Sequence, residues 1–123
     1  MSVLLWVGAG GFLGAILRYL VSGWIQGSGT QFPFGTLSVN FLGSFLLGTL
    51  MFLSEFKGIL SEEARLFLCI GMLGSFTTMS TFGYETFRLM DQGQWGLVST
   101  NILGSVILAV LGVYLGRTLA LQL

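Results

Sequence analysis

The chain has 123 residues, of which 54% are hydrophobic and only 8% are charged, and its five basic and five acidic side chains cancel. A soluble domain of this length needs a charged surface, so the composition argues against a soluble protein and indicates a membrane protein.

Four apolar stretches follow one another, over about residues 3–25, 34–56, 62–90 and 95–118. Each is long enough to cross the hydrocarbon core of about 30 Å as an α-helix, which takes roughly 20 residues. The first stretch lacks a basic leader and a small-residue cleavage site, so we interpret it as a retained span rather than a signal peptide. We therefore expect an all-α membrane protein in which residues 1–123 form a single four-span transmembrane domain.

Polar segments separate the spans. The first link, residues 27–33, combines glycines with Pro33, which ends one helix and lets the next begin near Phe34. In the second link, Ser61 is a suitable helix cap. The third link, residues 91–94, forms the last turn before the fourth span.

The third span differs from the others because hydroxyl side chains crowd its middle, from Thr77 to Thr81. Together with Gly74, these β-branched and polar residues weaken an α-helix. We predict a break near residues 74–79. Backbone groups freed at this depth must be satisfied by a neighbouring chain, water or an ion, so a break indicates a built site.

Small residues also recur four positions apart on three spans, a pattern that lets helix backbones approach closely. The pairs are Gly10 and Gly14, Ser44 and Gly48, and Gly112 and Gly116.

The basic residues are almost evenly divided between the two sides that four spans define. Lys57, Arg65 and Arg117 belong to the side of the termini, whereas Arg18 and Arg88 belong to the other. Because an excess of Lys and Arg normally fixes orientation, this balance predicts insertion in both directions. An antiparallel homodimer would follow.

Polar, uncharged side chains occur within three spans. Asn40 lies in the second, and Asn101 and Ser105 share one face of the fourth. The third adds Thr78, Ser80 and Thr81. One interpretation is that these groups only hydrogen-bond one helix to another. The other, favoured by their coincidence with the predicted break, is a path that coordinates an ion without holding it by an opposite charge.

Two further side chains have two interpretations each, and a third has one favoured interpretation. Phe82 is either a packing aromatic or a ring whose positive edge faces an anion. Arg18 either snorkels to the headgroups or draws anions toward an aqueous vestibule. Glu85 lies three positions before Arg88, which favours an ion pair between them on one helical face.

Three segments resemble the signatures of the Fluc (CrcB-type) fluoride channels, and together they span nearly the whole chain. They are residues 10–19 (GGFLGAILRY), residues 35–40 (GTLSVN) and residues 71–82 (GMLGSFTTMSTF), the last followed by Glu85 and Thr86.

The resemblance implies a passive fluoride-selective channel in the cell inner (plasma) membrane, built as an antiparallel dual-topology homodimer with two pores. It further implies a structural Na⁺ held between the subunits by the backbone carbonyls of Gly74 and Thr77, with Arg18 in the vestibule. No organic cofactor and no nucleic-acid partner are expected. The implied fluoride pore comprises Asn40, Thr78, Met79, Ser80, Thr81, Phe82, Asn101 and Ser105.

Two positions depart from the family pattern. Met79 stands where a first pore phenylalanine is usual, so bulk is retained while contact with a ring edge is not. Asn101 stands where a tyrosine is often found.

Two other functions remain open at this point. A proton-coupled exporter resembling the small multidrug resistance transporters would need an acidic residue in the first span, and residues 3–25 contain none. A non-transporting assembly subunit is the second. An enzyme is not expected, because the chain has no histidine and no nucleophile with a partner base.

Overall fold

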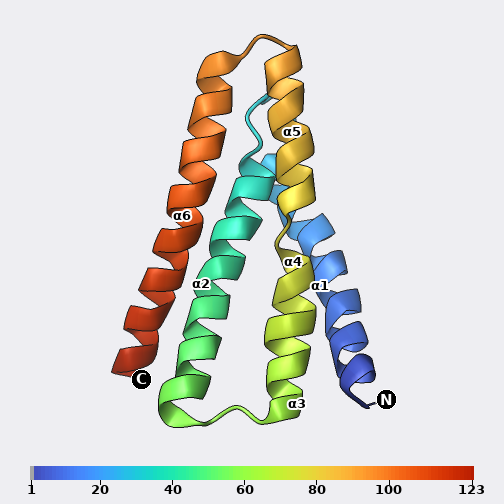
Figure 1. The fold of residues 1–123 in the computed structure, drawn as a ribbon. Helices are drawn as coiled ribbons and strands as arrows, with labels where there is room; N and C mark the ends of the chain where they lie inside the picture. Colours follow the sequence, from blue (N-terminus) through green and yellow to red (C-terminus); the bar gives the residue numbers. More distant parts are fainter. Residues whose placement is uncertain (1) are drawn as a thin grey trace.

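The structure, a computed structural model, describes residues 2–123, and all regular elements in that range are helices (Figure 1). Four helical segments in it are long and apolar enough to cross a membrane. The first, second and fourth are single helices, α1 (Ser2–Gln26), α2 (Phe34–Lys57) and α6 (Trp95–Gln122). The third comprises α3 (Glu62–Arg65), the π-helix η1 (Leu66–Leu73), α4 (Gly74–Phe76) and α5 (Met79–Asp91). The predicted all-α, four-span fold is confirmed.

The spans alternate in direction, and both termini lie at the same end of the bundle (Figure 1). α2 occupies the centre, where it packs most extensively against α6, while α1 packs mainly against η1. α5 makes only limited contact with its neighbours. One end of the third span is therefore held firmly by α1, and the other end is sparsely covered.

Local chemistry explains where the helices begin and end. Gly58 takes the left-handed conformation after α2 and donates its N–H to the Ser54 carbonyl. The Ser61 side chain caps α3 by accepting from the Ala64 N–H at 3.1 Å, as predicted. At the opposite end, Gln26 fastens the first link, because its amide donates to the Phe32 carbonyl and accepts from the Gly35 N–H.

The predicted close approach of small residues is present at two interfaces. A Cβ atom added to Gly14 of α1 would lie 2.0 Å from the Met72 carbonyl oxygen, and one added to Gly10 would lie 2.1 Å from that of Phe67. Between α2 and α6, a Cβ on Gly116 would lie 2.4 Å from the Phe45 carbonyl oxygen. These helices therefore touch backbone to backbone, which only glycine permits.

The third span is broken where hydroxyls crowd it. Thr77 and Thr78 are both extended, with φ and ψ of −88° and 157° and of −152° and 120° respectively. Leu66–Leu73, which α4 separates from the break, form the π-helix η1, and no sequence pattern predicts it. A π-turn holds more residues than an α-turn, so η1 changes which side chains face α1.

Candidate functional site

Asn40 of α2 bridges the break in the third span. Its Oδ1 accepts from the Thr78 N–H at 2.7 Å, and its Nδ2 donates to the Thr78 carbonyl at 3.1 Å. Both backbone groups of an extended residue at mid-span are thus satisfied by one side chain. An asparagine amide carries two N–H donors, and this clamp uses one of them.

Hydroxyl groups gather at the start of α5. The Thr78 Oγ1 caps the helix by accepting from the Thr81 N–H at 3.2 Å, and it donates to the Thr81 Oγ1 at 3.1 Å. The Ser80 Oγ lies 3.4 Å from the Thr78 Oγ1. The first turn of α5 also presents the positive end of the helix dipole, so this point combines neutral donors with a potential that favours anions.

A groove with a volume of about 370 Å³ runs along the break. It contains five of the eight residues predicted for the pore, which are Asn40, Thr78, Met79, Phe82 and Ser105. Ser44, Thr77 and apolar side chains of α2 and α6 form the rest of its wall. Met79 is 76% exposed, so the groove is open along the surface of the single chain. None of its lining residues carries a charge.

The other three predicted pore residues lie elsewhere. Ser80 is exposed and Thr81 half-buried, and both take part in the hydroxyl cluster without lining the groove. Asn101 is only 1% exposed and donates to the Thr86 Oγ1 at 2.9 Å, while its own oxygen accepts from Ser105. It connects α6 to α5 through Thr86 and does not line the groove, although Ser105, one turn further along α6, does. This geometry matches the helix-to-helix interpretation.

Arg18 of α1 reaches the other side of the break. Its Nε donates to the Ser75 carbonyl of α4 at 3.1 Å, and the side chain is half-buried. The Ser75 hydroxyl in turn donates to the Gly11 carbonyl of α1 at 2.9 Å. The arginine is therefore engaged with protein and does not only snorkel toward the headgroups.

Two carbonyls at the break differ from those of Ser75 and Thr78. Outside the ladders of the helices themselves, no donor from residues 2–123 bonds the carbonyl oxygen of Gly74 or that of Thr77. Carbonyl oxygens of this kind are suitable ligands for a hard cation. These two residues are the ones that the family resemblance assigns to Na⁺.

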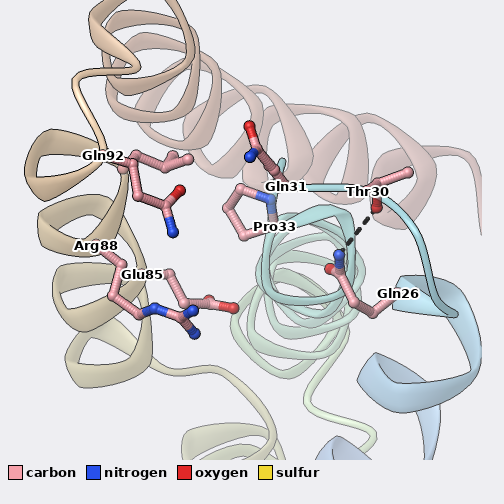
Figure 2. Close-up of a pocket in the computed structure, with 8 residues that line it drawn as sticks. Gln26, Thr30, Gln31, Pro33, Glu85, Arg88 and Gln92 are labelled. Atoms are coloured by element: carbon pink, nitrogen blue, oxygen red, sulfur yellow. Dashed lines mark hydrogen bonds between the residues drawn. The ribbon is translucent and has the colours of Figure 1, made fainter.

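A second polar cavity, of about 330 Å³, lies at the end of the bundle near the first link (Figure 2). Figure 2 shows Glu85 and Arg88 of α5 on one wall and Gln26 and Thr30 on the opposite side. The predicted partner of Glu85 was Arg88, but its carboxylate instead accepts a hydrogen bond from the Thr36 hydroxyl of α2. Sequence analysis missed Thr36, although it lies one turn before Asn40 on the same face of α2.

Fold and site together define a helical membrane protein with an uncharged groove beside a broken span, in which a few polar groups lie among apolar side chains. The family described as "CrcB-like protein, Camphor Resistance (CrcB)" matches residues 5–117. The chain is 53% identical to fluoride-specific ion channel FluC 3 of Methanosarcina barkeri, over 98% of this chain and 92% of that protein. It is 43% identical to the fluoride-specific ion channel FluC of Geobacter sulfurreducens, with both chains covered in full. The chain belongs to the CrcB-like family.

Proposed function

We propose that this protein is a passive fluoride channel, which lets fluoride leave the cell across the plasma membrane. The observation that carries the proposal is the uncharged groove at the break in the third span, in a chain whose relatives are named fluoride-specific ion channels. Fluoride trapped in the cytoplasm as an anion would then flow out down its own gradient.

The chemistry of the groove suits a small anion. Asn40 retains one N–H donor. The hydroxyls of Thr78 and Ser105 would donate to an ion by turning away from the oxygens of Thr81 and Asn101 that they now engage, so neutral groups would replace water around the ion. The start of α5 adds a favourable potential. Because no full positive charge lines the groove, the ion is not held tightly and can move on. Phe82 adds a ring whose edge is weakly positive.

A second, antiparallel copy of the chain would complete the pore. In one chain the groove is open at its side, with Met79 76% exposed, and α5 is sparsely covered. The nearly even division of basic residues supports insertion in both orientations. Two copies related by a twofold axis in the membrane plane would bring two grooves, and hence two pores, to one interface.

A structural Na⁺ between the two copies is part of the same proposal. The carbonyls of Gly74 and Thr77 fit such an ion, because no donor from residues 2–123 engages them outside the helix ladders. When bound, the cation would neutralise these oxygens at the break and tie the two chains together. Arg18, Asn40 and Thr78 would then fix the surrounding backbone by their own hydrogen bonds.

A proton-coupled exporter is less well supported. The first span, α1, contains no acidic residue, and the deep carboxylate of Glu85 accepts a hydrogen bond from Thr36 at a distance from the break. Among the described residues, none of those that line the groove is an acid or a base that could carry a proton.

Purified protein in liposomes tests the proposal and separates it from the idea of an assembly subunit. Vesicles loaded with potassium fluoride should release fluoride when a potassium ionophore compensates the charge. Vesicles loaded with potassium chloride should stay full under the same conditions. The proposal would be contradicted if vesicles that contain only this protein kept their fluoride, or if they released fluoride and chloride at similar rates.

A further inference from the structure

Arg18 contacts the backbone at the break, although sequence patterns relate it only to headgroups or to a vestibule. We propose that Arg18 is a positioning residue, which fixes the C-terminal end of α4 through the hydrogen bond from its Nε to the Ser75 carbonyl. The expected effect of Arg18 on fluoride flux rests on the proposed channel function. Its effect on the geometry of the break does not.

The break deprives the Ser75 carbonyl of its usual partner. In a continuous α-helix this oxygen would accept from the N–H four residues later, that of Met79. Met79 instead begins α5, beyond the extended residues Thr77 and Thr78. A carbonyl left without a donor inside a membrane is costly, so the charged Nε–H of Arg18 satisfies a group that the break itself exposes.

Arg18 and Asn40 hold opposite sides of the break from two different helices. Asn40 of α2 binds both backbone groups of Thr78, immediately before α5. Arg18 of α1 binds Ser75, near the end of α4. Since the groove lies along these residues, a displacement of α4 would move Thr77, which lines it.

The surface of α1 around Arg18 is shaped to receive Ser75. The Ser75 hydroxyl donates to the Gly11 carbonyl at 2.9 Å, and a Cβ added to Gly14 would lie 2.3 Å from that hydroxyl oxygen. Ser75 of α4 therefore fits closely against three residues of α1, which are Gly11, Gly14 and Arg18. A long cation that only drew anions from solution would need no such fit.

The identity of the donor atom gives a sharp test. The bond comes from Nε, which is separated from Cα by three methylene groups. Glutamine places its amide nitrogen at the same number of bonds from Cα, so Arg18→Gln can make the same contact without charge. Arg18→Lys keeps the charge but places a methylene group where Nε was. Arg18→Met keeps the length of the apolar stem and has neither property.

Fluoride efflux from liposomes should be measured for the parent and all three variants, after each is shown to elute as a single species. We expect Arg18→Gln to remain within about threefold of the parent, and Arg18→Lys and Arg18→Met to fall by about tenfold or more, as the loss of one hydrogen bond from a charged donor implies. Parent-like flux in Arg18→Lys with Arg18→Gln as slow as Arg18→Met would assign the role to charge and overturn the proposal. Parent-like flux in all three, or loss in all three, would overturn it as well.

Amide hydrogen exchange supplies a readout that does not depend on transport. The Thr77 N–H, which bonds the Leu73 carbonyl at 3.2 Å, reports on the end of α4. Exchange there should quicken in Arg18→Lys and Arg18→Met and stay parent-like in Arg18→Gln. Identical exchange in all four proteins would overturn the proposal. If even parent vesicles kept their fluoride, the channel function would fail while the exchange pattern still decided the role of Arg18.

Discussion

Met79 occupies the groove at the position where the family usually has a phenylalanine. Its side chain is 76% exposed in the single chain and lines the groove together with Phe82. A phenylalanine there would keep the bulk and add a ring with a weakly positive edge. We expect Met79→Phe to preserve fluoride efflux or raise it. Met90→Phe, the same change near the far end of α5, serves as the control, and a collapse of flux in Met79→Phe alone would contradict the placement of residue 79.

Asn101 is expected to matter for stability rather than for the path of the ion. It is buried between α5 and α6, where it bonds Thr86 and accepts from Ser105. Asn101→Ala would leave the buried Thr86 and Ser105 with fewer partners, at a cost of about 1–3 kcal/mol. The melting temperature in detergent should therefore fall.

Fluoride efflux per folded Asn101→Ala protein should stay close to that of the parent. Thr100→Ala is the matched control, because Thr100 is exposed and bonds only the Gly96 carbonyl of its own helix. If Asn101→Ala lowered the fluoride flux without lowering the melting temperature, Asn101 would instead be a pore residue.

Asn40 and Asn101 show what can be predicted about a candidate site from sequence and what cannot. Both are asparagines in apolar spans, and polarity alone singled out both. Only the three-dimensional arrangement separates them, because one faces the break and the other faces Thr86. Thr36 escaped notice for the same reason, since its partner Glu85 is 49 positions away in the chain.

At the scale of elements, glycine decides how α1 meets the third span. A Cβ on Gly14 would lie 2.0 Å from the Met72 carbonyl oxygen, whereas one on Gly8 meets nothing within 4 Å. We expect Gly14→Ala to force α1 away from η1 and to cost about 1–3 kcal/mol or more, as overpacked cores do.

Thermal unfolding of purified Gly14→Ala beside Gly8→Ala measures this effect. The first variant should melt well below the parent and the second should not, because alanine favours a helix when nothing opposes it. Equal melting temperatures would mean that α1 and η1 do not touch as described.

The existence of the four spans could be predicted from length and hydropathy, and the break could be predicted from β-branched and hydroxyl residues around Thr77 and Thr78. The π-helix η1 could not, since residues 66–73 are apolar throughout and their composition does not distinguish one helical pitch from another. η1 packs against α1, and tertiary packing of this kind can override local helical preference.

For the whole molecule, the balance of charge predicts two orientations in the membrane. Both termini lie at one end of the bundle, so a reporter at the C-terminus marks the orientation of the entire chain (Figure 1). We expect reporters active in the cytoplasm and reporters active outside it to work to similar extents when fused after Leu123. Adding two lysines beside Lys57 should shift the balance toward one side. Activity on a single side of the unaltered chain would contradict an antiparallel pair.

The central claim is that fluoride passes beside Asn40. The proposed roles of this residue, of the groove and of the homodimer all depend on it. In Asn40→Asp a fixed negative charge would lie about 4 Å from the ion, which costs about 4 kcal/mol at an effective dielectric constant of about 20. Fluoride efflux from liposomes should therefore slow by at least tenfold, while Gln122→Glu, which adds the same charge at the exposed end of α6, should match the parent. Undiminished efflux from folded Asn40→Asp protein would show that fluoride takes another route.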